Sequence, residues 1–95
     1  RLDLSRVADA RTWAAQAPRF DVLVHNVGVM LHGHSLTPEG AETSFATNLL
    51  VPFAMTEALR GAGALDAGSL IVAMSSGGAY GAKLDLDALE ALAPA

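Results

Sequence analysis

Two short, solidly apolar segments constrain the fold of this chain most, because each is followed directly by small polar residues and glycine. The first is Asp21-Val-Leu-Val-His-Asn-Val-Gly, and the second is Ser69-Leu-Ile-Val-Ala-Met, which continues into Ser75-Ser-Gly-Gly. A continuous apolar run of this length is typical of a strand covered on both faces, as in a parallel sheet. Two such strands with a helical segment between them predict a right-handed crossover.

Helical segments precede and follow the first apolar run. Ser5 is predicted to cap a helix over residues 6–17, which Pro18 ends. Thr37-Pro38-Glu39 predicts the start of a second helix, with a capping hydroxyl, proline at the first helical position and an acid in the first turn. This helix is expected to continue to about residue 60, where Arg60 and Gly61 end it.

The remaining segments complete an α/β pattern. Residues 1–4 resemble the end of a strand, and residues 29–36 are expected to form a loop. Residues 81–95 carry acids around leucines, so that either a short helix or a surface loop is expected there. Alternating strands and helices predict a parallel sheet with helices on its faces.

Composition excludes several classes of protein. Apolar residues make up 52% of the 95 residues and the net charge is only −4, which excludes intrinsic disorder. The sequence has no cluster of Lys or Arg, so no nucleic-acid-binding surface is predicted. No apolar run is long enough for a membrane span. The absence of cysteine excludes disulfides and thiolate metal ligands. We recognise no targeting segment and expect the protein in the cytoplasm.

The scarcity of charge is unusual for a short soluble chain, which must expose much of its surface. Only 17% of the residues are charged, and whole strands are apolar. We therefore expect residues 1–95 to be the central part of one larger domain, cut at both ends.

In open parallel sheets, ligands bind at the carboxyl ends of the strands. This rule indicates three places: the segment after Asp3, Asn26 to Gly28, and Ser75 to Gly78. Gly28 and Gly77 lack a Cβ, so the backbone there can approach a ligand closely. Three polar or glycine-rich strand ends favour a flat cofactor lying across the edge of the sheet.

These segments resemble the short-chain dehydrogenases/reductases. Asp21-Val-Leu-Val-His-Asn-Val-Gly is similar to the family's D-x-L-V-N-N-A-G strand, although His25 and Val27 replace its usual Asn and Ala. Phe45-Ala-Thr-Asn-Leu-Leu-Val-Pro-Phe resembles the following helix, and Leu70-Ile-Val-Ala-Met-Ser-Ser resembles the strand with the catalytic Ser. The match is greatest to the branch of dehydrogenase/reductase member twelve and the retinol-dehydrogenase-like proteins. The resemblance implies a Rossmann-type, doubly wound parallel sheet, present here in part.

The resemblance also implies roles for single residues. Asp3, with Leu4, would contact the adenine ring, and Asn26, Val27 and Gly28 would lie near the cofactor. Asn48 would belong to the proton relay. Ser76 would hydrogen-bond the substrate oxygen and stabilise the charge that develops on it.

The activity implied is hydride transfer between NAD or NADP and a small-molecule carbonyl or secondary alcohol. The whole protein is expected to be a homo-oligomer. The family's Gly-rich phosphate turn would lie before Arg1, and its Tyr-x-x-x-Lys pair after Ala95, so we expect this chain alone to be inactive. The alternative is a non-catalytic nucleotide-binding or scaffold protein on the same fold. Ser76 and Asn48 favour the enzyme, because a binding protein needs neither.

Other polar residues have simpler interpretations. His32 and His34 are expected in a solvated loop rather than at a metal, because no third ligand stands at suitable spacing; we predict no metal site. His25 is expected at the end of a strand with one backbone hydrogen bond. Tyr80 is predicted not to be the catalytic Tyr, because Lys83 follows it by three residues rather than four.

Pro52 predicts a distortion in the second helix. Proline has no amide hydrogen and its ring crowds the carbonyl four residues earlier, which here belongs to Asn48. We predict a bend or bulge near residues 48–52, with Asn48 facing Ser75 and Ser76. In the family that the chain resembles, the helix is distorted at the matching Asn.

Overall fold

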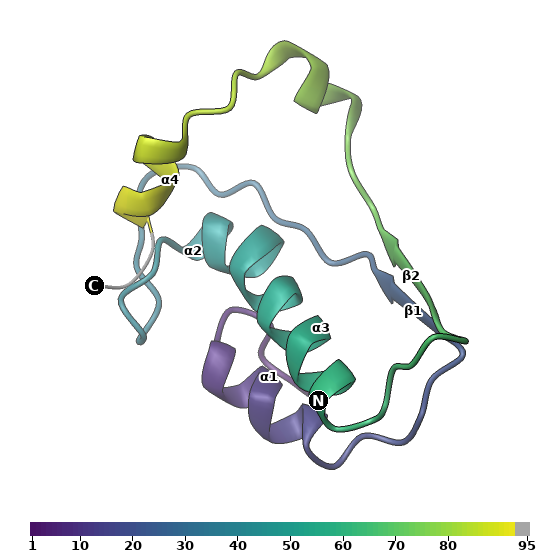
Figure 1. Cartoon of the computed structure of the whole chain (residues 1–95). Coiled ribbons are helices and arrows are strands. Elements are labelled where there is room, and N and C mark those ends of the chain that lie inside the picture. Colours follow the sequence, from purple (N-terminus) through teal and green to yellow (C-terminus); the bar gives the residue numbers. More distant parts are fainter. Residues whose placement is uncertain (93–95) are drawn as a thin grey trace.

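The computed structural model describes residues 1–92 and has a sheet layer and a helix layer (Figure 1). The sheet consists of β1 (Val22–His25) and β2 (Leu70–Ala73). Helices α1 (Val7–Ala14) and α3 (Val51–Gly61) pack against each other and cover one face of it. The α/β class is confirmed, as a partial Rossmann-like arrangement of two strands with helices.

The two strands are parallel, as predicted from the apolar runs. Their register pairs Val22 with Leu70 and His25 with Ala73, and the N–H of Met74 adds a bond of 3.0 Å to the carbonyl of His25. The predicted strand at residues 1–4 is wrong. The Asp3 carboxylate accepts hydrogen bonds from both the amide and the hydroxyl of Ser5, so the backbone turns there.

The helix predicted over residues 6–17 is α1, which is shorter at both ends. Ser5 does not cap it, because its hydroxyl is bonded to Asp3 and the N-cap position belongs to Arg6. The cap comes instead from a distant part of the chain. The Glu39 carboxylate accepts from the N–H of Val7 at 2.6 Å and from the N–H of Ala8 at 2.9 Å.

The helix predicted to begin at residue 38 begins five residues later, with α2 (Thr43–Phe45). Residues 37–41 form a tight turn in which the N–H of Gly40 bonds the carbonyl of Thr37 and Gly40 has a φ of 85°. Positive φ suits glycine and is incompatible with a right-handed helix. Glu42 is the N-cap, and its carboxylate accepts from the amides of Ser44 and Phe45.

The predicted bulge is confirmed. A π-helical turn, η1 (Ala46–Leu50), lies between α2 and α3, and the N–H of Val51 bonds the carbonyl of Ala46, five residues earlier. Such turns are rare and occur mostly as single bulges within α-helices. The helix ends at Gly61, as predicted, and Gly63 just beyond it has a φ of 81°.

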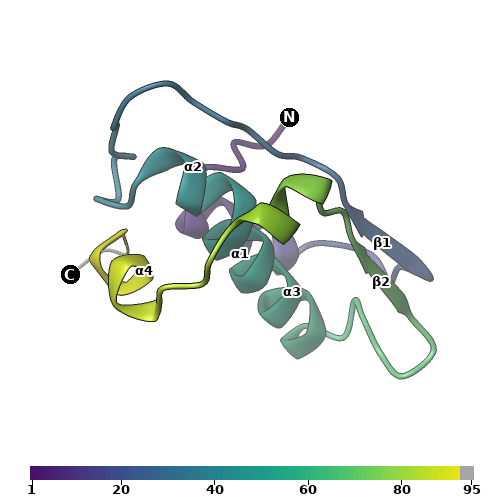
Figure 2. The same cartoon turned by 90° about the horizontal axis from the view of Figure 1, so that it is seen from above.

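The core lies between α1, α3 and the turn that follows α3. Side chains of the sheet and of the N-terminal segment pack against it, among them Leu23 and Leu4. The strands were predicted to be covered on both faces, whereas here the helices lie on one face of the sheet (Figure 2). Val22, Val24 and Leu70 are accordingly about half exposed. The buried cluster comprises Ala10, Ala14, Val51, Met55, Leu59, Ala64 and Leu65.

Beyond β2 the chain forms a 3₁₀ turn, η2 (Gly77–Gly81), and the short helix α4 (Leu86–Leu92). The helix alternative for this region is therefore correct over residues 86–92, and residues 93–95 lie outside the described part. The elements α2, η1 and α3 follow one another without a break and form one long helix. Both views place α4 beside the α2 end of this helix, away from the sheet (Figures 1 and 2). The N–H of Glu42 bonds the carbonyl of Leu92 at 3.0 Å and ties α4 to this end.

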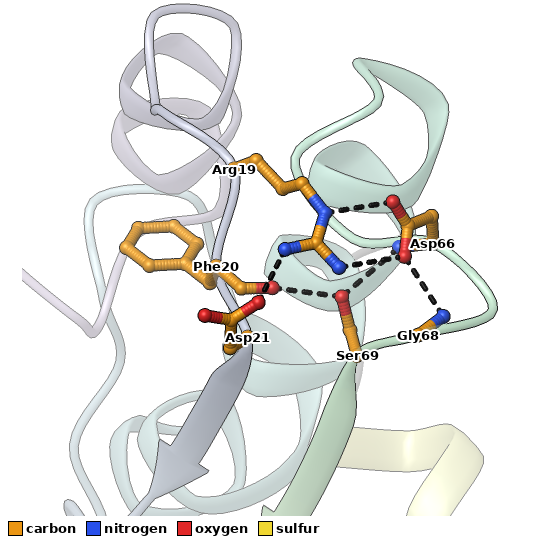
Figure 3. Close-up of polar contacts among 6 residues, drawn as sticks. All are labelled: Arg19, Phe20, Asp21, Asp66, Gly68 and Ser69. Carbon is orange, nitrogen blue, oxygen red and sulfur yellow. Dashed lines mark hydrogen bonds and ion pairs between the residues drawn. The ribbon is translucent and has the colours of Figure 1, made fainter.

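At the opposite end of the sheet, a polar network joins the two segments that lead into the strands (Figure 3). Arg19 makes two bonds to the Asp66 carboxylate, at 2.8 and 3.0 Å, and a third to Asp21. The guanidinium of Arg19, with help from the N–H of Gly68, lowers the pKa of Asp66 to about 2. Ser69 donates to the carbonyl of Phe20 at 2.7 Å, so the entry points of β1 and β2 are held side by side.

Candidate functional site

The carboxyl ends of β1 and β2 open toward the π-helical turn, and the predicted site residues gather around this edge. Asn26 to Gly28 follow β1 directly, and Ser75 and Ser76 follow β2 after Met74. Because the strands are parallel and in register to His25 and Ala73, these two segments leave the sheet at the same edge.

Asn48 connects the π-helical turn to the segment after β1. Its side-chain oxygen accepts from the N–H of Val29 at 2.8 Å, and its amide nitrogen donates to the carbonyl of Val29 at 2.7 Å. A Cβ at Gly28 would lie 3.7 Å from the Asn48 oxygen, which is ordinary van der Waals contact. Asn48 thus pins the backbone just after the Asn26–Gly28 segment.

Asn48 was predicted to face the end of β2 at Ser75 and Ser76, and it lines the same hollow as Ala73 and Met74 at that strand end. Both polar atoms of the Asn48 side chain are used by Val29, and within residues 1–92 no hydrogen bond joins Asn48 to Ser76. The Ser76 hydroxyl instead caps η2 by accepting from the N–H of Gly78 at 3.2 Å. A hydroxyl that accepts one bond still has its proton to donate, so Ser76 can hydrogen-bond a ligand oxygen as well.

Asp3, Leu4 and Val27 line one open groove, of about 780 Å³, together with Thr47. The hydrogen bonds from the Ser5 hydroxyl and amide lower the pKa of Asp3, so its carboxylate is ionised at neutral pH. Asn26 joins Leu4, Val27 and Thr47 at a smaller adjoining cavity of about 90 Å³. The N-terminal segment, the end of β1 and the π-helical turn therefore meet at one groove.

His25 has a different environment from the one predicted. Its Nε2 lies 2.7 Å from the Thr56 hydroxyl, and that hydroxyl donates to the carbonyl of Pro52 at 2.9 Å. Because the single hydroxyl proton is used by Pro52, Thr56 can only accept from His25, which requires a proton on Nε2. Burial lowers the pKa of His25 and favours its neutral form.

A third hollow, of about 320 Å³, lies between α3 and β2. His25 and Asn48 line it together with apolar side chains of α3 and of the β2 end, among them Phe53 and Met74. Apolar walls with a few polar groups are typical of a small-molecule site.

Other candidate groups stand apart from this edge. Tyr80 is 97% exposed in η2 and, within the described residues, contacts neither Ser76 nor Lys83 through a hydrogen bond. His32 and His34 are exposed in a loop, as expected. Among residues 1–92, no three His, Cys, Asp or Glu side chains are arranged to hold a metal ion. Nor does any helix of this part have the length and apolar character needed to cross a membrane.

Comparison with known proteins identifies the relatives. No family model matches the chain. A probable oxidoreductase of Streptomyces lividans is 44% identical over 92 residues, which is 90% of this chain and 30% of that protein. The Bos taurus dehydrogenase/reductase SDR family member 12 is 35% identical over 72 residues, 76% of this chain and 23% of that protein. The chain is a distant relative of the short-chain dehydrogenases/reductases.

Two further matches agree with this relationship. Bos taurus retinol dehydrogenase 12 is 36% identical over 80 residues, 80% of this chain and 25% of that protein. The crystal structure of an uncharacterised protein from Mycobacterium paratuberculosis has a TM-score of 0.78 at 29% identity, over 99% of this chain and 34% of that one. The chain thus spans about a third or less of the length of the relatives it matches.

The structure brings together most of the residues that the sequence singled out. Asp3, Leu4, Asn26 and Val27 surround two adjoining cavities, and Gly28 lies beside Asn48. Ser76 is not among the residues that line these two cavities or the hollow between α3 and β2. Thr47 and the His25–Thr56 pair were missed. The only sequence signal for Thr47 was its place beside Asn48, in the turn that Pro52 was predicted to distort.

Proposed function

We propose that residues 1–95 supply the central part of an NAD(P)-binding domain in an oxidoreductase that transfers hydride between the nicotinamide and a small carbonyl or secondary alcohol. The observation that carries the proposal is the joint at the edge of the sheet: Asn48, in a π-helical turn, holds Val29 beside the Asn26–Gly28 segment. The kinship with short-chain dehydrogenases/reductases supports the same reaction class. We also propose a cytoplasmic location.

In this proposal the groove of Asp3, Leu4 and Val27 holds part of the dinucleotide, and Gly28 allows its close approach. NAD or NADP, when bound, supplies the hydride acceptor or donor. The Ser76 hydroxyl donates a hydrogen bond to the substrate oxygen and stabilises the negative charge that develops there. Asn48 keeps the backbone after β1 in place, so its role toward the substrate is one of positioning.

We test the proposal in a chimera, because the chain spans only 25% of the length of Bos taurus retinol dehydrogenase 12. Its activity therefore cannot be compared directly with that of a full-length relative. The matching 80-residue segment of Bos taurus retinol dehydrogenase 12 is replaced with the part of this chain that aligns with it, which is 80% of the chain. Retinol oxidation is then followed with NAD and with NADP. We expect activity that falls at least about 100-fold in kcat/KM in a Ser76→Ala variant, because charge-stabilising donors typically contribute that much. A Ser75→Ala variant is the matched control and should stay within a few-fold of the chimera.

Two results would count against the oxidoreductase. A chimera with native-like circular dichroism that binds neither dinucleotide would contradict the cofactor site. A chimera that binds NAD or NADP, with Ser76→Ala as active as its parent, would favour a nucleotide-binding role for this chain without a catalytic one.

A further inference from the structure

His25 ties the end of β1 to α3 through its side chain. Its Nε2 lies 2.7 Å from the Thr56 hydroxyl, and that hydroxyl donates to the carbonyl of Pro52 at 2.9 Å. Because a hydroxyl has a single proton, Thr56 donates to Pro52 and accepts from the Nε2–H of His25. The two residues are 31 positions apart in the chain, and we call their bond the His25–Thr56 clasp.

The segment that follows His25 is anchored at both ends to the same long helix. Val29 is bonded through its N–H and its carbonyl to Asn48, at 2.8 and 2.7 Å, and His25 is bonded to Thr56. Both partners belong to the continuous helix of α2, η1 and α3. Among the described residues, the intervening Asn26 to Gly28 make no hydrogen bonds of their own. The position of this segment therefore depends on its two anchors.

The surroundings of His25 favour a neutral imidazole. The ring borders the cavity of about 90 Å³ that Asn26 also lines and the hollow of about 320 Å³ between α3 and β2, and most of the side chains lining both are apolar. Burial in these surroundings lowers the pKa of His25. Within residues 1–92 only the Nε2 of the ring makes a hydrogen bond, so a protonated imidazolium in this position would carry a second N–H donor without an acceptor.

One charged side chain borders the same hollows as His25, and it is already paired. Glu57 of α3 lines the hollow between α3 and β2, and its carboxylate accepts from Arg60 at 2.8 Å. The guanidinium lowers the pKa of Glu57, so this carboxylate is ionised throughout the range in which histidine titrates. Asp3 lines the adjoining groove, which His25 does not border. A protonated His25 would therefore find only a carboxylate that Arg60 neutralises, and burial remains the main influence on the imidazole.

We propose that the His25–Thr56 clasp positions the Asn26–Gly28 segment and is sensitive to acid: it holds while His25 is neutral and breaks when the imidazole takes up a proton. Protonation favours any conformation in which the imidazolium reaches water, because its charge is then solvated. After the clasp breaks, β1 keeps the bond from the N–H of Met74 to the carbonyl of His25, but the segment loses one of its two anchors. The clasp itself does not depend on the proposed function, whereas its effect on cofactor affinity rests on it.

The first experiment follows the imidazole nitrogens of His25 and the amides of Val27 and Thr56 by NMR, in the 95-residue chain between about pH 7.5 and pH 5. We expect the Nε2–H tautomer at neutral pH, and amide shifts of Val27 and Thr56 that change with the same midpoint as His25, below 6.5. His25→Gln keeps a donor and does not titrate, so both amides should lose this pH dependence. The amide of Ala10, fully buried in α1, should not change.

A pair of threonine variants tests whether Thr56 is the partner. Thr56→Val keeps the shape of the side chain but removes the acceptor, and Thr56→Ser keeps the hydroxyl. Thr12→Val is the matched control, because the Thr12 hydroxyl makes the same bond to the carbonyl four residues earlier, at 3.0 Å in α1, but none to a histidine. At neutral pH, Thr56→Val should move the Val27 amide toward its acid position, whereas Thr56→Ser and Thr12→Val should leave it in place.

The affinity for NAD, measured calorimetrically at the same two pH values, tests the positioning role. We expect NAD to bind about three- to tenfold more weakly at the acid pH, because the apparent affinity falls with the fraction of chains in the competent conformation. In His25→Gln the two affinities should differ by less than about twofold.

Each outcome separates this inference from the proposed function. If His25 titrates and the amides of Val27 and Thr56 do not follow it, or if Ala10 changes with them because the whole chain unfolds, the clasp is overturned and the proposed function stands. If the amides follow His25 but NAD binds equally well at both pH values, the positioning role is overturned. If the amides follow His25 and NAD binds at neither pH, the clasp stands and the proposed cofactor site fails.

Discussion

Glu39 caps a helix that lies more than thirty residues before it in the chain, and removing its carboxylate should loosen that helix specifically. A helix leaves its first N–H groups without partners inside the helix. In α1, Glu39 accepts from two of them, those of Val7 and Ala8, and the N-cap residue Arg6 provides no side-chain bond. The perturbation is Glu39→Ala, with Glu39→Gln as the variant that keeps one acceptor and loses the charge.

The expected cost follows from these contacts. Replacing a capping side chain with Ala typically costs about 0.5–2 kcal/mol, and a negative charge at a helix N-terminus contributes roughly 0.3–1 kcal/mol. Glu39 combines two short bonds with a full charge and is partly buried. We therefore expect Glu39→Ala to lower the free energy of unfolding by about 1–2 kcal/mol, and Glu39→Gln by about half of that. For a chain of this size, 1 kcal/mol corresponds to roughly 4–8 °C in Tm.

Thermal and urea unfolding followed by circular dichroism measure the global effect, and amide hydrogen exchange at Val7 and Ala8 measures the local one. The control is Glu90→Ala, because Glu90 is exposed in α4. We expect faster exchange at Val7 and Ala8 in both Glu39 variants, and no change in the control. If Glu39→Ala and Glu90→Ala had the same Tm and left exchange at Val7 unchanged, the long-range cap would not exist in solution.

Four further changes test other parts of the structure. Leu59→Ala, at a fully buried position, should cost about 2–5 kcal/mol in urea unfolding, whereas Leu84→Ala, at a position 72% exposed, should cost almost nothing. The pKa of His25 is lower in the folded chain than in the unfolded one, so the unfolded chain binds the proton more readily. The free energy of unfolding should therefore fall as the pH drops below about 6.5. His25→Gln should remove that part of the pH dependence. Asn48→Asp keeps an acceptor for the N–H of Val29 but loses the donor to the carbonyl of Val29. Amide exchange at Val29 should therefore become faster, and the free energy of unfolding should fall by about 1 kcal/mol. Asp66, with a folded pKa of about 2 against 3.8, stabilises the fold above pH 3.8; this contribution should disappear as the pH falls toward 2 and be absent at every pH in Asp66→Asn.

The strands and the helical bulge could be predicted from the sequence because their causes are local. Continuous β-branched and apolar residues from Val22 to Val24, followed by Asn26 and Gly28, have few other structural solutions. Likewise, the missing N–H of Pro52 acts on its own helix wherever that helix packs, and the structure has a π-helical turn next to it.

The errors lie where distant residues compete with local signals. Thr37-Pro38-Glu39 has the local features of a helix start, but Gly40 turns the chain there and Glu39 caps α1. The missed cap at Ser5 is an exception, because its competitor is local: the carboxylate of Asp3, two residues earlier, accepts from the Ser5 hydroxyl. His25 was expected to bond backbone, and it bonds Thr56, thirty-one residues away. Nothing in the spacing of such pairs along the chain identifies them before the fold is known.

A map of NADH contacts on the chain tests the central claim most directly, namely that the edge formed by the end of β1 and the π-helical turn faces a dinucleotide. NADH is titrated into the isotope-labelled 95-residue chain, and amide shifts are recorded. We predict that the largest shifts fall on Asp3, Leu4, Asn26 to Gly28 and Thr47, with Arg19 and Asp66 at the other end of the sheet unaffected. Shifts concentrated around Arg19 and Asp66, or no shifts at millimolar NADH, would contradict the account.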